Sequence, residues 1–158
     1  MAATQREQPW SEEQPRHGRV LLLTANPISQ AIVTIATAAG RPVVLLADDD
    51  GGPGLASLGP VEGDAVVLCD HDAPDAPQFL RDALASPASY VAMMASRRRA
   101  AGLLADLEVE GVPNLDKLHV PAGLDLGGKA AGEIALSVVA EIVAESHERA
   151  GGPMRGPR

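Results

Sequence analysis

The chain has 158 residues with a formal net charge of -8 at neutral pH, and 46% of its residues are hydrophobic. This length is enough for one domain with a substantial core and leaves no room for a second domain of ordinary size. An acidic chain lacks the broad basic surface that binds nucleic acids regardless of their sequence. We therefore expect no nucleic-acid partner.

The sequence also lacks the usual signs of membrane insertion or export. Its apolar stretches are far shorter than the roughly 20 residues that cross a bilayer, and its first residues are polar and include acids, unlike a signal peptide. The single cysteine, Cys69, cannot form an internal disulfide, which is typical of a reducing compartment. We therefore expect a cytoplasmic protein without a membrane partner.

Both ends of the chain differ in composition from the part between them. Residues 1–17 are rich in Gln, Glu, Pro and Arg, and residues 148–158 are rich in Gly and Pro. We expect both to be disordered tails that flank a single domain over residues 18–147. Aromatic residues make up only 2% of the chain, whereas small and aliphatic residues dominate, as is typical of helices packed on a parallel sheet.

The first part of that domain predicts a strand, a helix and a second strand. Residues 19–23 and 42–47 are short apolar runs that predict buried strands. Apolar spacing between them predicts a helix over 27–39, with Thr24 or Asn26 as its cap and a proline in its first turn. Because crossover connections are right-handed, the two strands should be parallel.

The alternation of strands and helices continues to the end of the domain. Further strands are expected over 64–70, 89–95 and 116–121, and further helices over 75–85, 97–109 and 133–147. The predicted fold is α/β and Rossmann-like, a doubly wound, mostly parallel sheet of about five strands with helices on both faces. Ligands of such sheets bind outside the carboxyl ends of the strands.

The last predicted helix is apolar around most of its circumference. Its polar residues form one narrow stripe at four-residue spacing: Glu133, Ser137, Glu141 and Glu145. A helix of this kind is buried on more than one side. It either lies under a neighbouring element or supplies a subunit interface, and of the two we favour the first.

The turn after the first strand, TANPISQA, differs from the G-x-G-x-x-G turn that holds a dinucleotide pyrophosphate. No glycine lies between Arg19 and Ala39, so Asn26 is more simply a structural cap than part of an anion site at the helix amino terminus. Asp48 follows the second strand, where dinucleotide-binding folds carry a ribose-binding acid. A solvated turn rich in Asp and Gly is the simpler interpretation there.

The segment CDHDAPD places Asp70 and His71 just past the third strand, at the ligand-binding edge of the predicted sheet, where both are candidate cofactor-binding residues. His, Cys and carboxylates are metal ligands, but adjacent residues of a strand point to opposite faces and cannot all converge. We therefore expect no metal site. A histidine can act as a general base near neutral pH, yet no nucleophile pairs with His71 at a recognisable spacing, so we expect no catalytic residues.

The run ASRRR follows the fourth predicted strand. Ser96 can cap the next helix, whose amino terminus would join Arg97 and Arg98 at the carboxyl end of that strand. This arrangement is typical of a phosphate site. A helix dipole disfavours cations in the first turn, so pairing of the arginines with nearby acidic side chains is an alternative to which we give equal weight.

A glycine-rich stretch follows the fifth predicted strand. It contains Gly123, Asp125 and Lys129, and Glu133 opens the helix after it. Glycines allow the backbone to approach a ligand closely. Because this stretch and the arginine cluster follow consecutive strands, we expect them to form two walls of one crevice.

Three segments carry a family resemblance when they are taken together. They are DAVVLCDHDAPDAPQFLRDAL, YVAMMASRRRAAGLLADLEVEGV and LHVPAGLDLGGKAAGEIALSVVAEIVA. Together they resemble the carboxyl-terminal Rossmann-like domain of the XdhC/CoxI family, the accessory factors that help mature molybdenum hydroxylases such as xanthine dehydrogenase and carbon monoxide dehydrogenase. The resemblance covers residues 19 to about 146.

The resemblance implies a protein without turnover chemistry of its own, which binds molybdenum cofactor as molybdopterin or its cytosine dinucleotide form. Ser96, Arg97 and Arg98 would then hold phosphate, while the opposite wall would be shaped by a second set of residues: Gly123, Asp125 and Glu133. The implied partner is the apo-hydroxylase, to which the cofactor is delivered. The family's cysteine-bearing amino-terminal domain has no counterpart in these residues, so a separate protein that supplies it is a second candidate partner. We also expect a homo-oligomer.

Two other functions stay open at this point. The strand-helix-strand start and Asp48 would suit an NAD(P)-binding oxidoreductase-like domain, although the missing glycines count against it. A degenerate Rossmann-like protein that acts only through protein–protein contacts, by way of the apolar last helix, is the other alternative.

Overall fold

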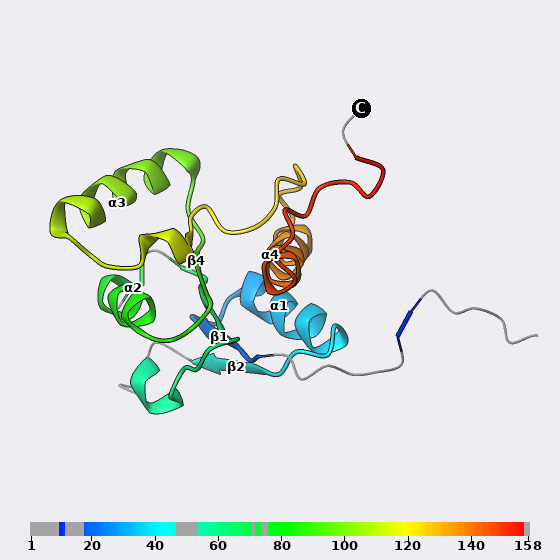
Figure 1. The fold of residues 1–158 in the computed structure, drawn as a ribbon, viewed down its shortest axis with the longest axis horizontal. Helices are drawn as coiled ribbons and strands as arrows, with labels where there is room; N and C mark the ends of the chain where they lie inside the picture. Colours follow the sequence, from blue (N-terminus) through cyan, green and yellow to red (C-terminus); the bar gives the residue numbers. More distant parts are fainter. Residues whose placement is uncertain (1–9, 12–17, 47–53, 71, 74–75, 157–158) are drawn as a thin grey trace, which may run out of the picture.

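The structure is a computed structural model, and it describes residues 10–11, 18–46, 54–70, 72–73 and 76–156. Figure 1 shows a central sheet with helices on both sides. None of the helices in this part of the chain is long and apolar enough to cross a membrane.

The sheet has five parallel strands in the order β2-β1-β3-β4-β5. The strands are β1 (Val20–Leu23), β2 (Val43–Leu46), β3 (Ala65–Leu68), β4 (Tyr90–Met93) and β5 (Leu118–His119). The chain winds from β1 outwards to β2 and then returns past β1 to build the other half. This confirms the predicted doubly wound parallel sheet, whose strand order reverses between β1 and β3.

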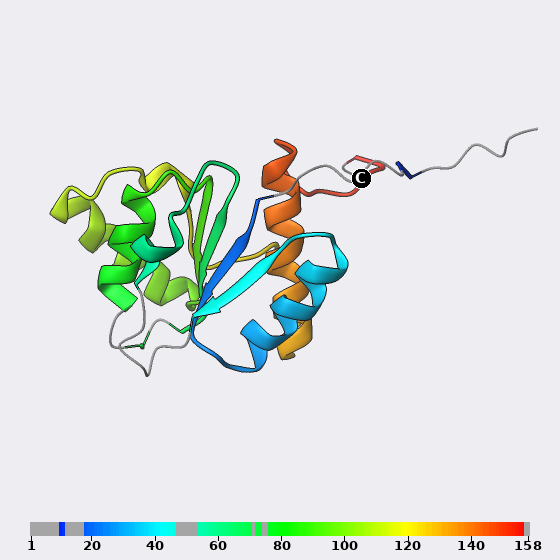
Figure 2. The same ribbon diagram turned by 90° about the horizontal axis from the view of Figure 1, so that it is seen from below.

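Four α-helices connect the described strands or follow them. They are α1 (Pro27–Ala38), α2 (Ala76–Ala85), α3 (Arg97–Glu110) and α4 (Ala131–Ser146). α1 and α4 cover one face of the sheet, while α2 and α3 cover the other (Figures 1 and 2). Helices on both faces confirm the predicted layers.

The elements differ from the prediction mainly at their ends. The fifth strand shrinks to two residues that pair with β4, because a 3-10 helix over Leu115–Lys117 precedes it and Pro121, which has no amide to donate, follows soon after. A second 3-10 helix, Leu55–Leu58, was not predicted. It places the buried Leu55 in the core on the α2 side of the sheet, a tertiary contact that local pattern does not reveal.

The core has two halves, one on each face of the sheet. β1, β3 and β4 are buried along their whole length, and alternate side chains enter opposite halves. On β1, Leu21 and Leu23 pack under α2 and α3, whereas Val20 and Leu22 pack under α1 and α4. β2 forms one edge of the sheet and is only partly buried.

The middle of the polar stripe on α4 faces the interior. Ser137 is buried and the Glu141 side chain is only 13% exposed, whereas the apolar Leu136 is 49% exposed. α4 also packs against α1 in the same core half. The helix therefore lies against a neighbouring element, as we favoured. Glu141 has partners on β4 and β5, whereas the Ser137 hydroxyl donates to the Ile134 carbonyl within α4.

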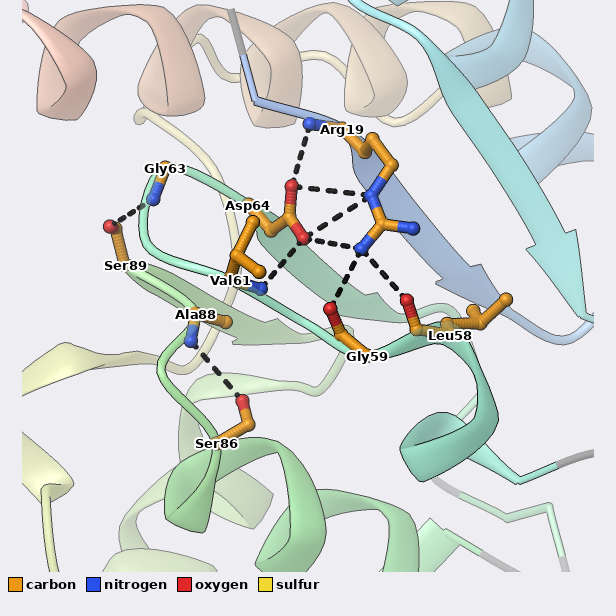
Figure 3. A network of polar contacts seen from close by, with 9 residues as sticks. All are labelled: Arg19, Leu58, Gly59, Val61, Gly63, Asp64, Ser86, Ala88 and Ser89. Carbon is orange, nitrogen blue, oxygen red and sulfur yellow. Dashed lines mark hydrogen bonds and ion pairs between the residues drawn. The ribbon is translucent and has the colours of Figure 1, made fainter.

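An ion pair between the buried Asp64 and Arg19 joins the strands at the amino end of the sheet (Figure 3). The Asp64 side chain is 2% exposed and lies 2.7 Å from Nη2 of Arg19, and it also accepts the Arg19 and Val61 backbone N–H groups. Gly18 passes so close to Gly63 that a Cβ atom would collide with the Gly63 carbonyl. This end of the sheet is tied together by side chains that bond backbone, so it has a structural role.

Candidate functional site

A cleft of about 620 Å³ opens at the carboxyl end of the sheet. Its lining comes from the end of β4, the loop between β5 and α4, and the amino-terminal parts of α1 and α4. Figure 2 shows the amino-terminal ends of α1 and α4 together at this edge. This is the edge at which doubly wound sheets bind their ligands.

The two walls predicted from the sequence meet in this cleft. Ser96 and Arg97 line one side, and Gly123, Asp125 and Lys129 line the other. The two segments come together because β4 and β5, which precede them, are hydrogen-bonded neighbours. The expectation of a single crevice between these segments is therefore met.

Arg97 reaches across the cleft towards Asp125. Its Nη2 atom lies 3.5 Å from Oδ2 of Asp125, and the two side chains are 84% and 81% exposed. A pair this long and this exposed contributes little to stability, because water and salt screen it. The Arg97 guanidinium is therefore available to an incoming anion, which needs only to displace Asp125.

The neighbouring arginines differ from Arg97 in their surroundings. Ser96 caps α3 by accepting the Arg99 N–H at 3.1 Å, as expected. Arg99 forms an ion pair of 2.8 Å with Asp72, while Arg98 is exposed and does not line the cleft. Both alternatives for the cluster therefore occur, with Arg97 lining the cleft and Arg99 pairing with an acid.

The electrostatic character of the cleft is mixed and locally positive. Arg97 and Lys129 line it, and Asp125 is the single acid among its described lining residues. Ile28 and Ile134 also belong to the lining, and they lie in the first turns of α1 and α4. Because a helix amino terminus carries partial positive charge and free amides, α1, α3 and α4 all favour an anion here.

Gly123 lies where the loop passes closest to α4. Its φ is 100°, a region that favours glycine, and a Cβ atom there would collide with the side chain of Ser137. The Gly123 N–H donates to Oε1 of Glu141 at 3.1 Å, and the Leu124 N–H donates to the Ser137 carbonyl at 3.2 Å. Backbone held against α4 thus forms this part of the wall.

Glu133 contacts the same loop from outside the cleft. It lies in the first turn of α4 and is exposed. Its carboxylate packs against Gly128, where an added side chain would collide with it. Glu133 is absent from the lining of the cleft, so its contact shapes the loop and does not face the ligand space.

Asn26 closes the turn after β1. Its Oδ1 accepts the Ser29 N–H at 2.9 Å, and the Ser29 hydroxyl accepts the Asn26 N–H at 2.8 Å, which caps α1. Its Nδ2 donates to the Cys69 carbonyl at 3.1 Å and so joins the ends of β1 and β3. These bonds fit the structural interpretation of Asn26, which does not line the cleft.

The same turn keeps the backbone shape of a glycine turn without the glycine. Thr24 follows β1 with φ at 78°, a conformation that is costly for a β-branched residue. It is buried, and its hydroxyl has no hydrogen-bond partner among the described residues. Of residues 24–29, only Ile28 lines the cleft.

The other residues predicted for this region follow β2 or β3. Asp70 shapes the turn after β3, because its Oδ1 accepts the Asp72 N–H at 2.9 Å. Burial raises the pKa of Cys69 to about 12, so the thiol stays protonated. Asp48 and His71 lie outside the described residues. Among the residues that are described, no group of three His, Cys, Asp or Glu side chains is placed to hold a metal ion.

Sequence reasoning missed the apolar part of the cleft. Ile28, Met94, Leu124 and Leu126 line it beside the polar groups. Met94 follows β4 and packs with the α1 side of the core, whereas Met93 packs with the α2 side. Strand alternation offered a signal for this placement. The cleft therefore offers apolar contacts beside its charged and polar groups.

The fold and the cleft define the class of the protein as a Rossmann-like domain with a cleft at the carboxyl ends of the strands. The chain belongs to the XdhC family, because residues 20–142 match the XdhC Rossmann domain. This confirms the family resemblance that the sequence carries.

Two known proteins are similar to this chain over part of their own length. The uncharacterized protein YqeB of Escherichia coli (strain K12) is 36% identical over 73 residues, which is 45% of this chain and 14% of YqeB. A crystal structure described as a xanthine dehydrogenase from Bacillus halodurans superposes with a TM-score of 0.67 at 21% identity, over 84% of this chain and 44% of that chain. The chain therefore spans less than half of each relative.

Proposed function

We propose that this chain is an accessory factor for the maturation of a molybdenum hydroxylase of the xanthine dehydrogenase or carbon monoxide dehydrogenase type. It binds molybdenum cofactor, as molybdopterin or in the cytosine dinucleotide form, and docks on the apo-enzyme. The observation that carries the proposal is the cleft of an XdhC Rossmann domain in which Arg97 faces the loop over residues 122–124, which we call the Gly123 wall.

The residues of the cleft fit the phosphate part of such a ligand. Arg97 can form charge-assisted hydrogen bonds to phosphate oxygens, and the capped amino terminus of α3 lies beside it with free backbone N–H groups. Backbone at Gly123 leaves room for close approach. We assign phosphate binding to Ser96, Arg97 and this wall. Arg98, which the resemblance implied as a further phosphate contact, is exposed and lies outside the lining, so we expect at most a weak contribution from it.

The rest of the lining fits a flat organic group better than a metal. Ile28, Met94 and Leu126 offer apolar contact for a pterin or a base. The described lining contains no His or Cys and a single carboxylate, Asp125, so these residues would hold the organic part of the cofactor better than its metal. The role of the chain is accordingly to hold and transfer the cofactor, with no turnover chemistry of its own.

The partners follow from this role. The cofactor must pass to an apo-hydroxylase, which is the first partner that we propose. The second is a separate protein that supplies the cysteine-bearing domain of the family. We also retain a homo-oligomer as part of the proposal, since the partly exposed edge strand β2 and the exposed Leu136 of α4 leave apolar surface for such contacts.

The test is calorimetry of the whole chain with cytidine diphosphate, inorganic pyrophosphate, NAD and extracted molybdenum cofactor. We expect the cofactor and the cytidine nucleotide to bind, and Arg97→Ala to weaken both by about tenfold, because a charge-assisted hydrogen bond is lost. Arg98→Ala is the matched control, since this arginine is also exposed but does not line the cleft. Its effect should be at most about twofold.

The outcomes separate the proposed function from the two alternatives. Binding of NAD without binding of cytidine nucleotide or cofactor would favour an oxidoreductase-like domain. Absence of all small-ligand binding, together with capture of the apo-hydroxylase by both arginine variants, would favour a protein that acts only through protein contacts. Either result would overturn cofactor binding by this cleft.

A further inference from the structure

A single carboxylate oxygen lies behind the glycine wall of the cleft. Oε1 of Glu141, on the inner side of α4, accepts the hydroxyl of Tyr90 at 2.6 Å and the backbone N–H of Gly123 at 3.1 Å. Nδ1 of His119 lies 3.4 Å from the same oxygen. Three groups from β4, β5 and the loop thus converge on one atom of α4.

These groups are shielded from water. Tyr90 is buried, and the side chains of Glu141 and His119 are 13% and 22% exposed. The rings of Tyr90 and His119 stack with centroids 4.5 Å apart. A buried carboxylate is costly unless hydrogen bonds satisfy it, so the convergence of three groups on Glu141 explains how it remains ionised there.

The pKa shifts agree with this geometry. Desolvation raises the pKa of Glu141, but hydrogen bonds from His119, Tyr90 and Gly123 outweigh it and leave the pKa below its usual value. The hydrogen bond to Glu141 raises the pKa of His119 against the opposing effect of burial. Burial, followed by the bond to Glu141, raises the pKa of Tyr90.

Three backbone N–H groups hold the Gly123 wall between β4 and α4 by hydrogen bonds. Ala122 donates to the Met93 carbonyl at 3.0 Å, Leu124 donates to the Ser137 carbonyl at 3.2 Å, and Gly123 donates to Glu141. Of these bonds, only the one from Gly123 ends on a side chain. It is therefore the bond whose strength depends on a protonation state.

We propose that Glu141 is the positioning residue of the cleft, and that its pairing with His119 makes the Gly123 wall, and with it anion binding, dependent on pH. The proposal about the wall stands on its own geometry, while its effect on anion binding rests on the proposed function. The wall is held best between the lowered pKa of Glu141 and the raised pKa of His119. Below that window Glu141 gains a proton and no longer offers a carboxylate to the Gly123 N–H. Above it His119 becomes neutral, so Glu141 stays ionised but loses the cation that fixes the position of its carboxylate.

Few other charges act on this pair. Glu145, one turn further along α4, raises the pKa of both Tyr90 and His119 by its charge. α1, which packs against α4, contains no charged residue. The loop contributes the Gly123 backbone. We therefore expect the response to pH to come from His119 and Glu141, while the charge of Glu145 changes the pKa of His119.

Nuclear magnetic resonance of the labelled whole chain tests the positioning role without any ligand. We expect the Gly123 amide proton to titrate with the same midpoint as the His119 ring, above the ordinary histidine value, and to exchange slowly. In Glu141→Gln the shared titration should disappear and the His119 midpoint should fall. A Gly123 amide that ignores the His119 titration in the wild type would overturn the proposal.

Two further variants keep the test informative if Glu141→Gln does not fold. Glu145→Gln is the matched control, because it removes a neighbouring charge that has no bond to Gly123. It should shift the His119 midpoint slightly and leave the Gly123 amide titrating at that same, slightly shifted midpoint. His119→Asn removes the titrating ring and keeps Glu141. Persistence of the Gly123 titration near neutral pH in this variant would contradict the proposal.

Titration with inorganic pyrophosphate then links the wall to the cleft. We expect wild-type affinity to fall by about tenfold once pH rises past the His119 midpoint, and Glu141→Gln to bind weakly at every pH. Arg97→Ala should lower affinity while keeping the pH dependence. If the wild type does not bind pyrophosphate, the anion site of the proposed function fails, and the Gly123 resonance alone decides the role of Glu141.

Discussion

Glycines in this chain are constrained to very different degrees. Gly18 faces the backbone of Gly63 at van der Waals contact, whereas Gly102 lies in α3 with open space around its Cα atom. The sequence alone does not show this difference. Gly18 lies between His17 and Arg19 and Gly102 between Ala101 and Leu103, and neither pair of neighbours indicates a close backbone contact. Only the tertiary contact with Gly63 requires a glycine at position 18.

We predict opposite effects for alanine at these two positions. Gly18→Ala should lower the free energy of unfolding by more than about 2 kcal/mol, because backbone atoms on both sides must shift to admit the methyl group. Gly102→Ala should raise it by about 0.5 to 1 kcal/mol, since alanine is the better residue in a helix interior. Urea denaturation measures both, and equal effects would contradict the contact at Gly18.

The ion pair between the buried Asp64 and the partly exposed Arg19 predicts an acid-sensitive fold. Desolvation raises the pKa of Asp64, but its bonds to Arg19 and to the Val61 N–H leave the pKa below the ordinary value. A depressed pKa contributes stability that is present above the ordinary Asp pKa and is lost as pH falls through the depressed one. Asp64→Asn should lower the free energy of unfolding by about 2 to 3 kcal/mol at neutral pH. The free energy of unfolding of this variant should also depend less on pH in the acid range, as measured by urea denaturation at several pH values.

The Arg81–Glu110 pair on the surface is the control for this prediction. Its side chains are 38% and 45% exposed, although the atoms are as close as 2.8 Å. Solvent screening makes such pairs weak, so Glu110→Gln should leave stability unchanged within error at neutral and acid pH. A large loss in this variant would show that proximity alone, without burial, decides the effect of an ion pair here.

At the scale of elements, caps explain why α1 and α3 begin where they do. α1 begins after Asn26, one of the two caps predicted for it, and α3 begins after Ser96, its predicted cap. The short β5 was overestimated because strand length depends on pairing with β4, which is a non-local property. Element ends set by side chains of the same segment were predictable, and ends set by a neighbour were not.

The double role of Asn26 can be separated by substitution. Asn26→Ala should lower the free energy of unfolding by about 2 kcal/mol, because it removes both the cap of α1 and the bond to the Cys69 carbonyl. Asn26→Asp keeps the cap acceptor and loses only the donor, so its cost should be smaller. Thermal unfolding of the two variants checks the order, and equal losses would contradict a separate role for the bond to β3.

The whole molecule is acidic, and its candidate anion site is a local exception. The formal net charge is -8, while the cleft gathers Arg97, Lys129 and three helix amino termini around one acid. Long-range repulsion from the rest of the surface acts against an anionic ligand, and short-range contacts must outweigh it.

This balance predicts the salt dependence of pyrophosphate binding. Arg97 and Asp125 are both exposed, so raising salt from about 0.05 M to about 0.5 M should weaken wild-type binding severalfold as the contact with Arg97 is screened. Arg97→Ala should show a flatter dependence. Asp125→Asn should raise affinity by about twofold to fivefold at low salt, because it removes the competing partner of Arg97. Weaker binding by Asp125→Asn would instead make this acid a ligand contact.

The sequence by itself determined the α/β class, the order of strands and helices, and the meeting of the arginine run with the glycine-rich loop. These follow from apolar periodicity, caps and the rule that consecutive parallel strands end at one edge, all of which are local or topological. Only the tertiary structure decided that Arg97 lines the cleft while Arg99 pairs with Asp72, and that Glu141 supports the Gly123 wall. The spacing of the α4 stripe shows that its polar residues share one side of the helix, but what that side meets depends on packing. Tyr90 and Glu141 are 51 residues apart in the chain, and they become partners because α4 packs on β4.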